Sequence, residues 1–174
     1  PTTQAFDTAR QDTIADRIES EAFDLVAWDD LGTRRRRDGA DAHVEAILDA
    51  VSVTSPPDAV VDLGNGAGAV SVEALTQMGC DVETLNAQPD GAFPGRPSEP
   101  TAENCGSLTA LARETRRLGI AHDGDADRLR AVTEDGEFLS GDTLLAILAR
   151  DAADPGETVA APVNTSLAVD DYLA

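Results

Sequence analysis

The sequence predicts an α/β protein of three layers, in which helices cover both faces of a mainly parallel sheet and one antiparallel strand lies at the edge. Three observations favour this fold. Short β-branched apolar segments alternate with segments of helical periodicity from residue 40 onward. Clusters of Gly, Pro, Asp and Asn separate these segments. Finally, the apolar segments 119–122 and 129–133 are joined too closely for a parallel crossover, which needs about a dozen residues or more.

The first part of the chain predicts two helices separated by a linker. Ile14 and Ile18 lie four residues apart, on one face of a helix. The arginine run 34–37 is typical of a solvent-exposed connection, with anion binding as the alternative. A second helix is expected from residue 40, with apolar residues at helical spacing: Val44, Ile47, Leu48 and Val51.

Strands and helices alternate in the middle of the chain. Residues 59–63 (AVVDL) predict a strand that leads through the turn GNGAG into a helix, which Gly79 ends. Residues 81–85 (DVETL) predict the next strand. The Pro/Gly-rich segment 90–100 then leads to a predicted helix that runs through four residues: Leu108, Leu111, Thr115 and Leu118.

The last elements surround an aspartate-rich loop. Residues 119–122 and 129–133 predict two strands, and 135–138 a turn. Ser140 or Asp142 can cap the next helix, which is expected to bury three leucines: Leu144, Leu145 and Leu148. Residues 158–163 (TVAAPV) predict the start of a further strand.

The charge of the chain excludes several classes of partner. Acidic residues outnumber basic residues 33 to 13, the net charge is −20, and every basic residue is Arg. Such a surface repels nucleic acid and anionic membranes, so neither is an expected partner. The excess of Asp and Glu without any Lys predicts a halophilic protein, because at 1 M salt the Debye length is only about 3 Å. An ordinary acidic protein is the alternative.

The apolar segments and cysteines predict a soluble protein of the cytoplasm. The longest strongly apolar run, 144–149, is far shorter than the about 20 residues that cross a bilayer, and no signal peptide opens the sequence. Cys80 and Cys105 form no CxxC pair, so neither a zinc site nor a disulfide framework is expected.

Two motifs stand at the expected carboxyl ends of strands, where open α/β sheets bind their ligands. The first, GNGAG at 64–68, resembles the glycine loop of nucleoside-binding methyltransferases. However, the strand 81–85 is followed by Asn86, where such proteins usually have an acidic residue that binds ribose. A turn that needs glycine for its backbone geometry is therefore the preferred interpretation.

The second motif places Asp123, Asp125 and Asp127 within five residues. Crowded carboxylates repel one another and raise one another's pKa, so we expect a cation among them, or water around all of them. Oxygens at alternate positions can converge on one hard cation. A calcium-binding hand does not fit, because Arg128 stands where that loop requires Gly. The neighbouring His122 is expected to pack at the strand end and not to act as a ligand.

Three motifs in order resemble the second domain of the α-D-phosphohexomutases, the phosphomannomutase/phosphoglucomutase family, and its archaeal-type members most. They are VVDLGNGAGAV at 60–70, the segment LNAQPDGAFPGRPSEPTAEN at 85–104, and the segment from GIAHDGDADR to LLAILAR at 119–150. The resemblance implies that 1–38 ends a first domain, that 39–154 is the metal-binding second domain, and that 155–174 begins a third.

The resemblance implies an isomerase that transfers phosphoryl groups. Such enzymes interconvert hexose 1-phosphate and hexose 6-phosphate through a phosphoserine and a bisphosphate. Carried over by motif, Asp123, Asp125 and Asp127 are the implied Mg²⁺ ligands, and Arg128 is an implied catalytic residue that faces the phosphate. This agrees with phosphoryl transfer, which depends on positioning and on neutralising charged oxygens.

The chain also departs from the family pattern. It has no Ser-His-Asn-Pro motif, which carries the phosphoserine in the family. The resemblance therefore implies part of a mutase, inactive by itself, whose hexose preference depends on residues outside it. A methyltransferase-like nucleoside-binding domain and a non-catalytic metal-binding module are the alternatives.

We expect the thermal stability of the chain to rise with ionic strength. Its 20 excess negative charges repel one another more in the compact state than in the unfolded chain, and salt screens this repulsion. Melting curves followed by circular dichroism should therefore move to higher temperature between low and molar KCl. Curves that stay in place would contradict the high-salt interpretation.

Overall fold

The computed structural model describes residues 6–154 and 156–173, and the chain forms two units, Pro1–Arg37 and Asp38–Ala174. In the first unit the predicted helix is present as α1, Thr8–Glu19, and Asp7 caps it by accepting a 2.9 Å hydrogen bond from the backbone N–H of Arg10. All described residues of this unit are exposed, including the arginine run 34–37. The first unit therefore has no core of its own within the described residues.

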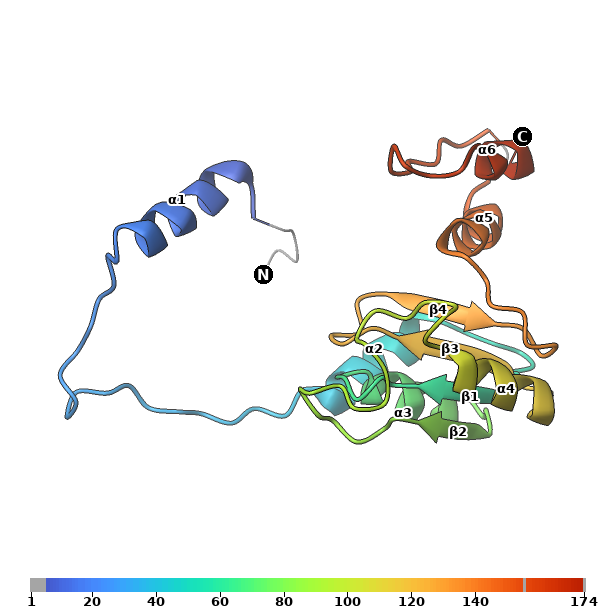
Figure 1. The fold of residues 1–174 in the computed structure, drawn as a ribbon, viewed down its shortest axis with the longest axis horizontal. Helices are drawn as coiled ribbons and strands as arrows, with labels where there is room; N and C mark the ends of the chain where they lie inside the picture. Colours follow the sequence, from blue (N-terminus) through green and yellow to red (C-terminus); the bar gives the residue numbers. More distant parts are fainter. Residues whose placement is uncertain (1–5, 155, 174) are drawn as a thin grey trace. The chain divides into compact units, whose positions relative to one another are not determined.

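The second unit contains a four-stranded sheet with the order β2-β1-β3-β4. The strands are β1, Ala59–Asp62; β2, Val82–Leu85; β3, Leu118–His122; and β4, Leu129–Val132. The central strand β1 pairs in parallel with β2 and β3, while β4 pairs antiparallel with β3 at the edge, as Figure 1 shows. This confirms the predicted sheet.

Helices cover both faces of this sheet, which confirms the predicted three layers. Side chains alternate along β1, so that Val60 joins the cluster beneath α4, Gly106–Thr115, while Ala59 and Val61 join the cluster beneath α3, Ala69–Gln77. The helix α2, Ala40–Ala50, packs on α3. All four residues of β1 are buried, as expected for a parallel strand between two helical layers.

The fourth predicted helix is shorter than its apolar pattern suggested. Leu118 is not on α4 but is the first residue of β3, where it pairs with Ala59. The helix ends because Arg116 adopts a left-handed conformation, with φ 57°, which turns the chain back toward the sheet.

The helix after β4 is α5, Gly141–Ala152, and Ser140 caps it by accepting a hydrogen bond from Thr143. The prediction that this helix buries Leu148 is wrong, since Leu148 is 59% exposed. Its buried residues are Ala146 and Ala149, each 8% exposed, and their small side chains allow a further helix to pack closely against α5. The other two predicted leucines of this face are half-buried: Leu144 and Leu145.

The end of the chain also differs from the prediction. Residues 158–163 form no strand; they lie in a loop, and the described strands offer them no pairing partner. A strand requires a neighbour for its backbone hydrogen bonds, so its apolar sequence alone does not create one. The loop leads into α6, Leu167–Leu173, which packs on α5 beyond the β4 edge of the sheet (Figure 1).

Within the part of the chain that the structure describes, no helix combines the length and the apolar character that crossing a bilayer requires.

Leu108 provides a test of the core beneath α4. It is 0% exposed and belongs to the cluster around Val60, so Leu108→Ala should lower the free energy of unfolding by about 2–5 kcal/mol. Leu148→Ala, on the exposed side of α5, is the control and should change it by less than about 0.5 kcal/mol. Urea denaturation followed by circular dichroism measures both, and equal effects would contradict this packing.

Candidate metal centre at the aspartate loop

The aspartate loop, residues 123–128, joins β3 to the antiparallel strand β4. The backbone N–H of Arg128 donates to Asp123 Oδ1 at 3.0 Å, and the backbone N–H of Ala126 donates to the Asp123 carbonyl at 3.2 Å. Ala126 has φ 61°, a left-handed conformation that is unfavourable for a residue with a Cβ. The Asp123 side chain is 1% exposed, and its hydrogen bond with Arg128 joins the first and last residues of the loop.

The loop brings the three predicted carboxylates together. One oxygen each from Asp123, Asp125 and Asp127 lies within 4.8 Å of the other two. Asp123 is buried, whereas Asp125 and Asp127 are exposed. Searched over residues 6–154 and 156–173, this is the one group of three such side chains close enough to hold a metal ion. Carboxylate oxygens are the ligands that hard divalent cations prefer.

The electrostatics of the loop leave negative charge uncompensated. Burial acts to raise the pKa of Asp123, but hydrogen bonds from the backbone and side chain of Arg128 outweigh it, so the pKa lies below its ordinary value. The pKa of Asp127 is raised, first by the charge of Asp125 and then by desolvation and by Asp123. A cation bound between the carboxylates would relieve this repulsion.

Arg128 lies against the carboxylates. Its Nε is 2.9 Å from Asp123 Oδ2 and 3.5 Å from Asp127 Oδ1, and its Nη1 pairs with Glu99. The side chain is still 57% exposed. Arg128 therefore supplies one positive charge to the loop while part of its guanidinium group stays open to an anion.

A buried ion pair that the sequence analysis missed lies beside the loop. Arg96 Nε donates to Asp62 Oδ2 at 2.8 Å, and both side chains are 2% exposed. The other Asp62 oxygen accepts hydrogen bonds from Gly64 N–H and from the Asn86 side chain, each at 2.9 Å. One signal was present in the sequence, because a charged residue inside a buried strand requires a partner.

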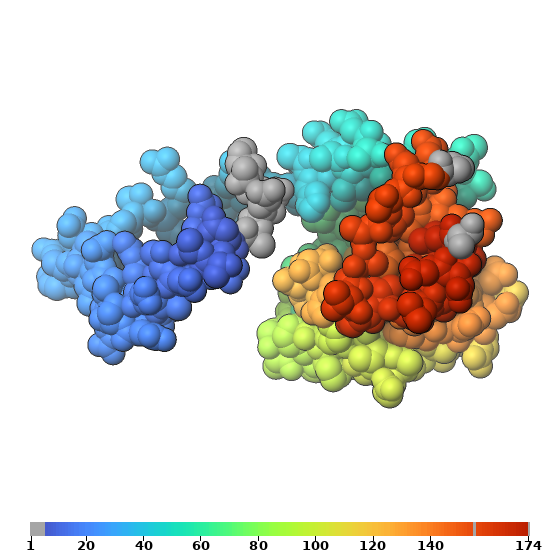
Figure 2. Space-filling view, turned by 90° about the horizontal axis from the view of Figure 1, so that it is seen from above, coloured from blue at the N-terminus to red at the C-terminus, as the bar shows by residue number. Residues whose placement is uncertain are grey.

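The glycine turn packs directly against the aspartate loop. The backbone N–H of Ala67 donates to the Gly124 carbonyl at 3.0 Å. A Cβ at Gly66 would collide with this same carbonyl oxygen, so only glycine allows the close approach. On its other side Gly124 lies against Phe93 and Ser98. Figure 2 shows the light-orange part of the chain that contains the aspartate loop beside the yellow-green segment that precedes α4.

This packing disfavours the nucleoside-binding alternative. The space next to Gly64 is filled by the Arg96 guanidinium group. Asn86, which stands where a ribose-binding acid would be expected, uses its side chain to donate to Asp62. Gly64 has φ 54°, which agrees with the preferred interpretation of a turn that needs glycine for its backbone geometry, and Gly66 additionally allows the contact with the aspartate loop.

His122 precedes the aspartate loop and is 9% exposed. Its Nε2 lies 2.9 Å from Ser71 Oγ, while Nδ1 has no hydrogen-bond partner. Burial lowers the pKa of this imidazole. These contacts agree with the expected packing role. A pocket of about 420 Å³ opens beside it, lined in part by His43 and Asp125.

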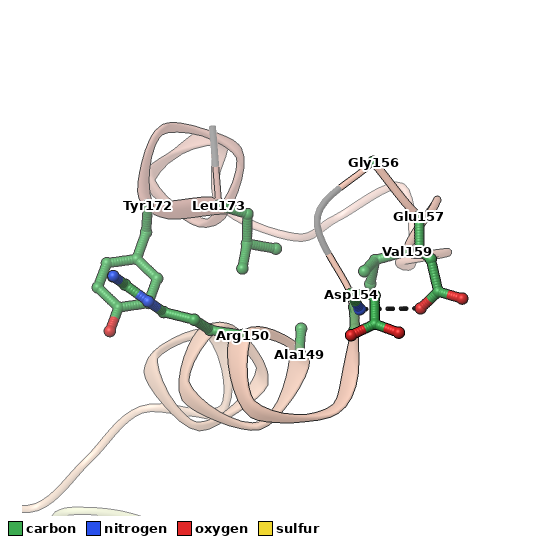
Figure 3. Close-up of a pocket in the computed structure, with 9 residues that line it drawn as sticks. Ala149, Arg150, Asp154, Gly156, Glu157, Val159, Tyr172 and Leu173 are labelled. Atoms are coloured by element: carbon green, nitrogen blue, oxygen red, sulfur yellow. Dashed lines mark hydrogen bonds between the residues drawn. The ribbon is translucent and has the colours of Figure 1, made fainter.

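A second pocket, of about 430 Å³, lies between α5, α6 and the connection between them. Figure 3 shows the Arg150 side chain against the ring of Tyr172, with 5.0 Å between the guanidinium carbon and the ring centroid. The Asp154 backbone N–H donates to the Glu157 carboxylate at 2.9 Å (Figure 3). This pocket shares no residue with the aspartate loop, so we do not assign it to the same site.

Comparisons with known proteins agree with this architecture. The family model for the α/β/α domain II of phosphoglucomutase/phosphomannomutase matches residues 41–136, more than half of the chain. A phosphoglucomutase/phosphomannomutase family protein from Burkholderia thailandensis has a TM-score of 0.68 and 32% identity over 84% of this chain and 32% of its own. A structure from Thermus thermophilus, described as a putative phosphomannomutase, has a TM-score of 0.61 and 25% identity over 68% of this chain and 29% of its own.

The sequence relatives extend over almost the entire chain. A protein of Methanosarcina acetivorans described as a probable phosphoglucosamine mutase is 44% identical over 99% of this chain and 41% of its own length. A protein of the same description from Methanopyrus kandleri is 46% identical over 94% of this chain and 37% of its own. The chain thus spans about two fifths of the length of these relatives. With the sheet, the aspartate loop and these matches together, the chain belongs to the phosphoglucomutase/phosphomannomutase family.

Proposed function

We propose that this chain is the metal-binding part of a phosphohexomutase, which interconverts hexose 1-phosphate and hexose 6-phosphate through a phosphoserine and a bisphosphate. The observation that carries the proposal is the convergence of three carboxylates at the carboxyl edge of the sheet, in a chain that belongs to this family. In this proposal residues 39–154 form the metal-binding domain, and the segments on either side belong to its neighbours.

Asp123, Asp125 and Asp127 would hold a Mg²⁺ ion, which carboxylate oxygens suit. When bound, this ion supplies positive charge near the oxygens of the phosphoryl group in transfer. Asp123 accepts two hydrogen bonds from Arg128, so it would be the rigid ligand of the ion. Asp125 and Asp127 are exposed and would be open to the metal ion and the substrate phosphate.

Arg128 would bind a phosphate oxygen of the substrate. Its backbone N–H and its Nε stay hydrogen-bonded to Asp123, while Nη1, which pairs with Glu99, can exchange that partner for an anion. In a chain with a net charge of −20, such a local cation and a bound metal ion are needed to attract an anionic sugar phosphate.

The names of the relatives support the substrate class. The archaeal relatives are described as probable phosphoglucosamine mutases, and the structural relatives as phosphoglucomutase/phosphomannomutase proteins. A hexose or hexosamine monophosphate is therefore the proposed substrate. The acidic composition without Lys supports a soluble enzyme of a high-salt cytoplasm that acts on small molecules and not on nucleic acid.

Substitution of one aspartate should weaken metal binding. Asp125→Asn removes a charged ligand without changing size, and we expect at least about a tenfold loss of Mg²⁺ or Mn²⁺ affinity, as for the loss of a partner in other metal sites. Titration calorimetry on the chain measures this loss. Asp49→Asn, an exposed carboxylate on α2, is the matched control and should leave the affinity unchanged. Unchanged affinity in Asp125→Asn would exclude the proposed metal site.

Activity can be tested in a chimera. Residues 1–174 would replace the matching segment of the Methanosarcina acetivorans relative, which is 44% identical. We expect the chimera to interconvert glucosamine 1-phosphate and 6-phosphate, with glucose and mannose phosphates tested in parallel. In the same chimera, Asp125→Asn should abolish turnover and Asp49→Asn should not. A soluble chimera that is inactive on all three sugars would contradict the proposed function.

A further inference from the structure

Residues 96–99 contact the residue just before the aspartate loop and the residue at its end. At the beginning of the loop, Arg96 Nη2 donates to the His122 carbonyl at 2.6 Å. At its end, Glu99 pairs with Arg128. Arg96 lies in a loop between β2 and α4, so a segment distant in sequence holds the residues that precede and follow the carboxylates.

The Arg96 guanidinium group is fixed by several partners at once. Nε donates to Asp62, and Nη1 donates to the carbonyls of Pro97 and Ser98 at 3.0 and 3.2 Å. The side chain is 2% exposed, so water does not compete for these contacts. A planar group held at each nitrogen cannot rotate without breaking a buried hydrogen bond.

Arg96 hydrogen-bonds to both strands at the point where the backbone pairing between β1 and β3 ends. The last pair of that ladder is Asp62 with Ala121, so the next residue, His122, has no partner on β1. Arg96 Nη2 reaches both the His122 carbonyl and, at 3.4 Å, the Asp62 carbonyl. It thereby links the two parallel strands one residue beyond their last backbone pair.

We infer that Arg96 is a positioning residue for the metal centre, which acts through the His122 carbonyl and sets the position of Asp123. The carbonyl belongs to the peptide group between His122 and Asp123, so a hydrogen bond that fixes this plane also fixes the Cα of Asp123. The inference rests on the proposed metal site and adds a residue that touches neither metal nor substrate.

Arg96→Lys tests this role. Lysine keeps a positive charge beside Asp62, but its ammonium group cannot reproduce the planar fork that reaches two strands. We expect the Mn²⁺ affinity of the chain, measured by electron paramagnetic resonance titration, to fall by about tenfold or more. Arg113→Lys is the matched control, because Arg113 also donates to a backbone carbonyl, that of Asp135, but away from the loop. It should leave the affinity unchanged.

A spectroscopic readout reports on the contact without metal. The chain has two histidines, His43 and His122, so labelling histidine with carbonyl ¹³C gives two resonances. Arg96→Lys should move the His122 signal upfield, as expected when a carbonyl loses a strong donor, and leave the His43 signal in place. A His43→Gln variant assigns the two signals.

The outcomes separate the two proposals. Absence of Mn²⁺ binding by the unmodified chain overturns the metal site and this inference with it. Normal Mn²⁺ binding that Arg96→Lys does not weaken, or an unmoved His122 signal, overturns the positioning role alone. If Arg96→Lys does not fold, the Asp62→Asn/Arg96→Gln double variant is measured in the same way, because removing both charges of a buried pair often preserves stability.

Discussion

The buried ion pair between Asp62 and Arg96 is the interaction on which the functional edge of this protein depends. Two charges without access to water are stable only when each is paired and hydrogen-bonded, and here both conditions are met. Breaking one partner of such a pair leaves an uncompensated buried charge, at a cost of about 3–5 kcal/mol. The pair therefore fixes the loop after β2 onto the ends of β1 and β3.

Backbone strain is concentrated at the same edge. Four residues other than glycine adopt positive φ in the loops that meet there: Asn65, Asn86, Phe93 and Ala126. Such conformations persist where the surroundings determine them strongly, and they are common at functional sites. At this edge the surroundings are the neighbouring loops. Asn65, for example, donates to the Gln88 carbonyl at 2.8 Å and accepts from Gly95 N–H at 3.0 Å.

Local sequence patterns were sufficient for the sheet and for the aspartate loop. The positions of the strands followed from the short apolar segments, and the antiparallel direction of β4 from the short β3–β4 connection. Three carboxylates in five residues are visible without any tertiary information. The contacts of Arg96 with Asp62 and His122, which form a clamp on the ends of β1 and β3, were not predicted. The buried charge of Asp62 signals that it needs a partner, but not which residue, 34 positions away, supplies it. Leu118 was assigned to a helix because apolar periodicity does not show where a helix ends. Leu148 was expected to be buried because this periodicity does not show which element packs against the helix.

The separation of these contacts along the chain has a consequence for the order of folding. Asp62 and His122 both bind Arg96, from 34 residues before it and 26 residues after it. Contacts between distant segments form only after the entropy of closing long loops has been overcome, so they tend to form late. A nascent chain cannot complete the clamp until β3 has been synthesised. The aspartate loop therefore acquires its final geometry only when distant segments have met, as in the β1–β3 pairing of Ala59 with Leu118, unlike small zinc domains, in which the metal itself drives folding.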